Sequence, residues 1–171
     1  MEYRSKLKKR KKSGFIIGAV VVLVLILGYQ NLISGNSFSI TNGDQQVINR
    51  YLNEQVMDPN FGGEVFSVYE VLQSNQETGE IYIWAFIQEY YESDTGLESG
   101  TGMSVPMVLY VDQNGESLEI KSHTFPRDGS YYPEDIKTLF PRRIRSKIHD
   151  YPSKHMDGLV DEMETMINAE N

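Results

Sequence analysis

The chain has 171 residues, with 24 acidic and 16 basic side chains, a formal net charge of -8 and no cysteine. The lack of cysteine excludes disulfide bonds and a lipid-modified cysteine anchor, so a folded domain must depend on an ordinary apolar core. An acidic surface repels nucleic acid, and we therefore expect no nucleic-acid partner.

The N-terminal part of the chain has the pattern of a membrane anchor. Seven of the first twelve residues are Lys or Arg, and residues 15–27 carry no charge. With its apolar flanks the uncharged stretch reaches about 20 residues, or about 30 Å of helix, which is enough to cross a bilayer. The positive-inside rule then predicts a basic cytoplasmic segment at residues 1–13 and a transmembrane signal anchor at residues 14–33. The rest of the chain would lie outside the cell, in a single-pass protein of the cell membrane.

Two other interpretations of this segment stay open. A cleaved signal peptide has the same basic and apolar parts, but small residues suited to cleavage first occur at Ser37 to Ser39, well beyond Leu27. The other alternative is a soluble protein in which the segment is a buried helix. No Asn-x-Ser/Thr acceptor for glycosylation occurs in the chain, which fits a bacterial, Gram-positive source.

The charge of the expected external part differs from that of the whole chain. From residue 34 onward there are 9 basic and 23 acidic residues, a net charge of -14. Residues 44–119 hold 14 acidic side chains and a single Arg, whereas residues 121–154 hold 8 basic and 4 acidic side chains. This segregation indicates either a dipolar surface or an internal match of charges.

A stalk and a helix are expected first. Residues 34–43 are small and polar, as in a short flexible stalk, and residues 44–171 would form the extracytoplasmic domain. We expect Asp44 to cap a helix, because the apolar residues from Val47 to Val56 have helical spacing. Asp58-Pro59 ends that pattern.

Four segments with the character of strands follow, at residues 65–72, 81–91, 105–111 and 118–125. The second is apolar on both faces, which predicts a central strand covered on both sides. The Gly/Ser/Glu-rich residues 92–102 are expected to form a loop. Asn114-Gly115 predicts a two-residue hairpin turn between the last two strands. The four segments are therefore expected to form an antiparallel meander.

Three short helical segments are expected at the C-terminal end. Pro133 suits the first position of one helix, and Pro141 separates that helix from a basic turn at residues 142–149. After Pro152, Ser153 is expected to cap an amphipathic helix with one apolar stripe, formed by Met156, Leu159, Val160, Met163, Met166 and Ile167.

The predicted fold class is α+β: an N-terminal transmembrane helix, then a helix plus a four-stranded antiparallel meander with C-terminal helices. This order is found in cystatin-like and NTF2-like folds. The analogy concerns architecture and brings no activity with it.

The sequence contains no recognisable catalytic or metal-binding motif. The three histidines share no ligand spacing, and HExxH is absent, so we expect no metal and no cofactor. Ser104 lacks the second glycine of a nucleophile elbow. Carboxylates are so frequent around Glu89 to Glu98 that close pairs arise by chance, and we expect no catalytic residue there.

The most distinctive polar stretch runs from Pro126 to Pro133. It suits a corner between a strand and a helix, or a binding edge together with the basic turn that follows. The candidate binding residues are Arg127, Asp128, Tyr131, Tyr132, Arg142, Arg143 and Arg145. They would offer an anionic ligand or partner a basic surface on an acidic domain.

The run PRDGSYYPEDIKTLFP, with GEIYIWA and SGTGMSVPMV upstream, resembles uncharacterised extracytoplasmic domains of Gram-positive bacteria. These are similar to the ectodomains found with membrane sensors of the BlaR1 or M56 peptidase type. The resemblance covers roughly residues 64–145 and implies a sensory or partner-binding ectodomain. It does not imply the peptidase, since the zinc motif and the additional membrane spans of those sensors are absent.

We therefore expect a membrane-anchored extracytoplasmic binding or sensory accessory module without catalytic activity. Its partners would be the membrane, through the N-terminal helix, and a protein or another component of the cell envelope. The alternatives are a cell-wall-associated enzyme, in the form of a carboxylate-based hydrolase, and a protective protein that binds a toxin or a protease.

Overall fold

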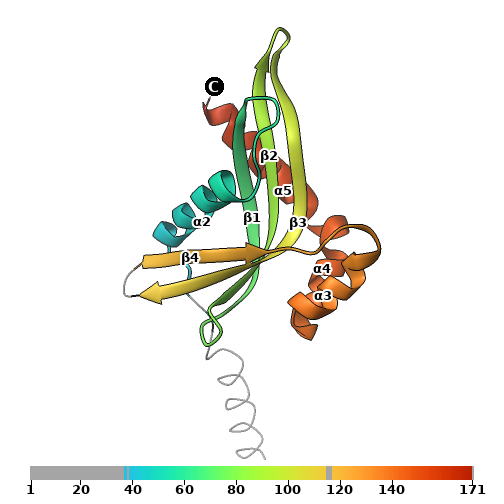
Figure 1. Cartoon of the computed structure of the whole chain (residues 1–171). Coiled ribbons are helices and arrows are strands. Elements are labelled where there is room, and N and C mark those ends of the chain that lie inside the picture. The colour runs from blue at the N-terminus through green and yellow to red at the C-terminus, as the bar shows by residue number, and fades with distance from the viewer. Residues whose placement is uncertain (1–36, 38, 115–116, 171) are drawn as a thin grey trace, which may run out of the picture. The chain divides into compact units, whose positions relative to one another are not determined.

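The computed structural model describes residues 37, 39–114 and 117–170 (Figure 1). The predicted cytoplasmic segment, the predicted anchor and the first part of the predicted stalk lie outside the described residues. Among the residues that are described, no helix is both long and apolar enough to cross a membrane. Residues 38–171 form one compact unit.

Helix α2 (Asn42–Gln55) begins with a capping box. The Asp44 N–H donates to Thr41 Oγ1 at 3.2 Å, and the Thr41 N–H donates to Asp44 Oδ2 at 2.9 Å. The helix is confirmed, but its N-cap is Thr41 and not Asp44, because Asp44 is the third helical residue that completes the box. Asp44 Oδ1 also accepts the Leu118 N–H at 3.3 Å, which ties the start of α2 to the last strand.

The four strands form a single antiparallel sheet in the order β1-β2-β3-β4, as the predicted meander requires. Strand β2 is central and is buried on both faces from Ile81 to Ala85, so this prediction is also confirmed. Strands β1 and β4 are the two edges. The bounds are β1 (Glu64–Asn75), β2 (Glu80–Ser93), β3 (Gly96–Asn114) and β4 (Ser117–Thr124).

Strand β3 is much longer than predicted, and the expected loop at residues 92–102 is mostly strand. Glu98 pairs with Tyr91, and Gly102 pairs with Gln88, so the β2–β3 hairpin continues to its tip at Ser93 and Gly96. The glycines that suggested a loop allow close approach instead: a Cβ on Gly100 would lie 2.7 Å from Glu89 Oε2. At the other end of β3, the turn was predicted at Asn114-Gly115, but Asn114 is a strand residue paired with Ser117, and residues 115–116 between them lie outside the described residues.

Three helices and one short 3-10 turn close the described part of the chain: η1 (Gly129–Tyr131), α3 (Tyr132–Leu139), α4 (Arg142–Lys154) and α5 (Met156–Glu170). Two boundary predictions were wrong. The basic turn is the regular helix α4, which continues through Pro152, and the last helix begins at Met156 and not after a Ser153 cap. Pro152 lies in the last turn of α4 and cannot donate a helical hydrogen bond, but the helix continues past it, and the His155 N–H donates to the Tyr151 carbonyl oxygen at 3.0 Å.

Helices cover both faces of the sheet (Figure 1). Ile48 and Leu52 of α2 pack against one face of the sheet. Tyr151 of α4 and Leu159 of α5 pack against the other face, beside Trp84. The apolar stripe of α5 is confirmed by the burial of Leu159, Met163 and Ile167. The fold is therefore α+β, with a helix, a four-stranded antiparallel sheet and C-terminal helices.

Candidate functional site

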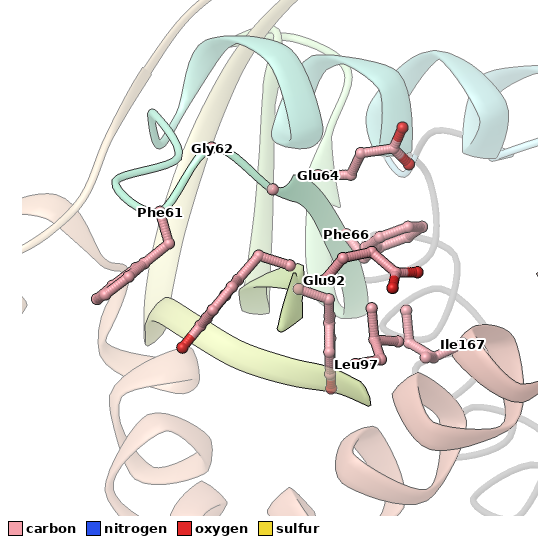
Figure 2. Close-up of a pocket in the computed structure, with 10 residues that line it drawn as sticks. Phe61, Gly62, Glu64, Phe66, Glu92, Leu97 and Ile167 are labelled. Atoms are coloured by element: carbon pink, nitrogen blue, oxygen red, sulfur yellow. The ribbon is translucent and has the colours of Figure 1, made fainter. Parts of the chain in front are cut away.

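A hollow of about 420 Å³ lies where β1 begins and the β2–β3 hairpin leaves the body of the domain (Figure 2). We call it the aromatic–acidic pocket, after the side chains that line it. They come from the loop before β1, from both strands of the hairpin and from α5. The lining residues are Phe61, Gly62, Gly63, Glu64, Phe66, Tyr90, Tyr91, Glu92, Leu97 and Ile167.

One buried carboxylate, that of Glu89, holds the loop that forms the wall of this pocket. Glu89 has no exposed surface. Its two oxygens accept four backbone N–H groups, from Phe61 at 2.7 Å, Asn60 at 3.0 Å, Gly63 at 3.1 Å and Thr101 at 3.2 Å. Burial alone would raise the pKa of Glu89, but these donors outweigh it and lower the pKa to about 2. The loop is therefore fastened to β2 and β3 before any ligand arrives.

The loop approaches β2 closely, and Gly63 makes this approach possible. A Cβ on Gly63 would lie 2.7 Å from the carbonyl carbon of Tyr90 and 2.8 Å from Tyr91 Cβ. These separations are far below ordinary carbon–carbon contact. A side chain at this position would push the loop away from Glu89.

Aromatic rings form most of the apolar surface of the pocket. Phe61 is 59% exposed and stacks on Tyr91, with ring centroids 5.0 Å apart and planes 13° from parallel. Phe66 meets Tyr90 edge to face at a centroid distance of 6.0 Å. Leu97 is also exposed, at 40%. A large exposed aromatic ring that is held in a fixed position is a typical interface anchor.

The charges of the pocket are all of one sign. Glu64 and Glu92 are exposed and are its only ionisable lining residues apart from the tyrosines, since no Lys, Arg or His lines it. Figure 2 shows both side chains on the side of the pocket where Phe66 lies, with Phe61 on the other side. The pocket therefore combines aromatic faces with carboxylates, the two kinds of group that attract a cation.

The structure divides the predicted basic site into two groups, at the two ends of α3. At the first end, the Arg127 Nε and Nη2 donate to the two carboxylate oxygens of Asp135 at 2.8 Å each, and the guanidinium lies 4.3 Å from the centre of the Tyr131 ring. These hydrogen bonds lower the pKa of Asp135 to about 2. Asp128 is exposed just before η1, and Tyr132 is half-buried. Arg127 is thus already paired within the domain.

The second group begins after the other end of α3, whose eight residues span about 12 Å. Arg142 and Arg143 are exposed. Arg145 is half-buried, and its guanidinium donates to the carbonyl oxygens of Phe140, at 2.7 Å, and of Lys137. Arg145 therefore satisfies the last carbonyl groups of α3 and has a structural role.

Another polar cluster borders the core but lacks the pairing of a nucleophilic site. Ser104 Oγ accepts the Trp84 Nε1–H at 2.9 Å and donates to Met156 Sδ at 3.2 Å. His155 Nδ1 lies 3.5 Å from a carboxylate oxygen of Glu70. The serine hydroxyl is thus directed to a thioether and not to the histidine. In the described part of the chain, no group of three or more His, Asp or Glu side chains is placed to hold a metal ion.

Sequence reasoning did not find the aromatic–acidic pocket. It treated Glu89 as one of many solvated carboxylates and assigned Glu92 and Leu97 to a loop. The local signal was Asn60 to Gly63, an aromatic residue among small and polar ones just before a strand. The segment forms the pocket wall because it is hydrogen-bonded to Glu89, and a local sequence pattern does not reveal that long-range contact.

Comparison with known proteins found no matching family model, no similar curated protein and no similar solved structure.

Proposed function

We propose that this protein is a membrane-anchored extracytoplasmic binding or sensory accessory module without catalytic activity. We further propose that it holds a cationic group of a protein or cell-envelope partner in the aromatic–acidic pocket. The observation that carries the proposal is that the exposed, stacked pair Phe61 and Tyr91 lines the same pocket as the carboxylates Glu64 and Glu92.

Physical chemistry favours a cation for this pocket. An ammonium or guanidinium group is attracted to the face of an aromatic ring and donates hydrogen bonds to carboxylates. The free Phe61 surface would be buried at the same time, which adds hydrophobic free energy. Because Glu89 already fixes the loop, binding would not have to order it, and that lowers the entropic cost.

The pKa shifts of the carboxyl groups favour a binding module over the alternative, a carboxylate-based hydrolase. A general acid in such an enzyme needs a carboxyl group whose pKa is raised. Where the pKa of a carboxyl group in the described residues is displaced, it is lowered: Asp44, Glu89, Glu98, Asp135 and Asp150. These groups accept hydrogen bonds that hold structure in place, which suits a binding module.

The membrane location and the sensory role rest on the sequence. The basic and apolar N-terminal pattern supports the anchor, with the N-terminus in the cytoplasm and the domain outside. The resemblance of residues 64–145 to sensor ectodomains supports a partner in the envelope. A net charge of -14 from residue 34 onward supports a partner that is basic where it touches the domain.

Photo-crosslinking in intact cells tests the binding site. A photoreactive benzoyl-phenylalanine would replace Phe61 in the full chain, and in a second variant it would replace Tyr131. The two side chains are a matched pair, since they are 59% and 57% exposed, and Tyr131 belongs to the basic site predicted from the sequence. We expect a crosslinked partner from position 61, its loss when Glu64→Lys and Glu92→Lys are added, and none from position 131.

Crosslinking from position 131 alone would overturn the pocket and place the interface at the corner around Arg127. Crosslinking from position 61 that survives both charge reversals would show that the carboxylates do not select the partner. In that case the proposed cationic ligand would be wrong.

A further inference from the structure

A second hollow, of about 490 Å³, follows the outer edge of strand β1. Four consecutive residues of β1, from Val68 to Val71, line it. Val68 belongs to the core on one face of the sheet, and Tyr69 packs into the core on the other. Because successive side chains of a strand point to opposite faces, a hollow that touches all four must run along the edge of the strand. We call it the edge groove.

Helices border this groove on both sides. Asn49 of α2 and Glu162 of α5 line it together with β1. Figure 1 shows β1 as an outer strand of the sheet. The row of outward N–H and C=O groups that an edge strand carries thus lies at the bottom of a groove between α2 and α5, and offers a template for another strand.

Unsatisfied polar atoms gather at the same place. Among the described residues, three buried side-chain atoms have no hydrogen-bond partner: Asn49 Oδ1, Tyr69 Oη and Gln73 Nε2. Asn49 and Tyr69 line the edge groove, and Gln73 follows two residues after its Val71. Buried polar atoms without a partner are costly and rare in native proteins. Polar groups beside the edge strand are thus left unpaired in the free domain.

The electrostatics of the groove select the charge of the ligand. Glu70 and Glu162 are the ionisable carboxylates among its lining residues, and no Lys or Arg lines it. Burial, together with the negative charges of Glu162 and Asp44, raises the pKa of the Tyr69 hydroxyl to about 12. The groove therefore lies at negative potential, which favours a basic occupant. A second copy of the same acidic chain would be repelled.

The usable edge ends at a defined point. The pairing of β1 with β2 shifts between Val71 and Gln73, and the intervening Leu72 carbonyl oxygen accepts a hydrogen bond from Lys147 Nζ at 3.1 Å. A bulge and a lysine together block strand addition beyond Val71. In the other direction β1 begins at Glu64, which lines the aromatic–acidic pocket. From its start to the bulge β1 has eight residues, about 27 Å, and the edge groove is lined by the last four of them, Val68 to Val71.

We propose that the edge of β1 from Glu64 to Val71 accepts an extended, basic segment of a partner protein as an added strand. The segment reaches from the edge groove to the aromatic–acidic pocket, where one of its cationic side chains binds. In this last respect the inference rests on the proposed function. Main-chain hydrogen bonds to β1 hold the segment, and Glu70 and Glu162 select basic side chains.

Synthetic peptides test strand addition with the full chain in nanodiscs of zwitterionic lipid. The probe is an alternating Lys–Val peptide of about eight residues, the length of β1 from Glu64 to Val71. Its analogue carries methyl groups on alternate backbone nitrogens, which keeps the charge but removes the donors for pairing. We expect the probe to shift the NMR signals of the Val68 to Val71 amides, and the analogue to bind at least about tenfold more weakly.

Charge variants locate the site. Val71→Lys and Glu162→Lys should each weaken binding of the probe by about tenfold, because both place a like charge in the edge groove. Glu119→Lys, the matched control on β4 at the opposite edge of the sheet, should leave it within about twofold. Equal binding of probe and analogue, no binding at all, or equal weakening by the control would overturn strand addition. A dimer joined through β1 would also overturn it, since the occupant would then be a second copy.

The two proposals fail separately. If Glu92→Lys weakens binding while methylation and Val71→Lys do not, strand addition is wrong and the pocket stands. If methylation and Val71→Lys weaken binding while Glu92→Lys does not, strand addition at β1 is supported and the aromatic–acidic pocket is not the site of the cation.

Discussion

Replacement of Gly63 by alanine tests whether the loop of the aromatic–acidic pocket must touch β2. The new methyl group would lie 2.7 Å from the Tyr90 carbonyl carbon and 2.8 Å from Tyr91 Cβ. Carbon atoms pack at about 3.5–4.0 Å, so the loop must retreat by roughly 1 Å. That retreat stretches the bond from the Gly63 N–H to Glu89, now 3.1 Å long. We expect a loss of about 1–3 kcal/mol in the free energy of unfolding, as for other overpacked sites.

Gly158 supplies a matched control for the same substitution. It lies exposed in α5 with nothing within 4 Å of a Cβ. Gly158→Ala should therefore stabilise the domain, by up to about 1 kcal/mol, through helix propensity alone. Urea unfolding of residues 38–171, followed by circular dichroism, measures both. Hydrogen exchange at the Phe61 amide reports the release of the loop. A Gly63→Ala domain as stable as the wild type, with Phe61 still protected, would refute the close approach.

Three other predictions concern charge and topology. Because the folded-state pKa of Glu89 is about 2, below its ordinary value of 4.5, its contribution to stability is complete above pH 4.5 and is lost as the pH falls toward 2. Glu89→Gln should thus lower stability at neutral pH and flatten its acid dependence in a urea series, whereas an unchanged slope would contradict the buried anion. Arg145→Ala should cost about 1–3 kcal/mol through its two lost hydrogen bonds, while Arg142→Glu and Arg143→Glu stay within about 0.5 kcal/mol in thermal unfolding. Protease added to intact protoplasts should remove the domain; a protected full chain, or a mature N-terminus near residue 40, would show that the anchor prediction is wrong.

Local signals in the sequence were sufficient for the order of the elements. Strand β2 was recognised as central because both of its faces are apolar, and α5 because its apolar residues recur at helical spacing. The start of α2 was misplaced by a few residues, since a capping box contains two suitable caps and only the geometry separates Thr41 from Asp44. The boundary between α4 and α5 was also misplaced by a few residues. It was predicted at Pro152 because proline usually ends a helix, whereas here it lies in the last turn of α4.

The candidate site could not be read from the sequence for a different reason. Its wall depends on contacts between residues 26 to 29 positions apart, such as the bonds from Gly63 and Asn60 to Glu89. Pattern rules treat a glutamate in a strand as solvated, because a buried carboxylate is rare unless donors surround it. The glycines after the hairpin tip suggested a loop, although Gly100 lies within β3 and allows Glu89 and Phe61 to approach that strand closely.

The role of Glu89 also explains why the site should prefer cations. Backbone N–H groups that converge in a loop form a natural binding site for an anion, and in this domain the carboxylate of Glu89 already occupies it. The remaining charges at the pocket, on Glu64 and Glu92, are negative and face solvent. An external anion therefore finds no cationic side chain among the lining residues, while an external cation finds carboxylates and aromatic rings. In a chain without cysteine, this internal anion fastens the loop where a secreted domain often uses a disulfide. The binding surface would consequently be insensitive to thiol reductants and sensitive to strong acid. Release of the loop as the pH falls toward 2, seen as a change in the NMR signal of the Phe61 amide, with no release under reducing conditions, is the behaviour that this arrangement requires.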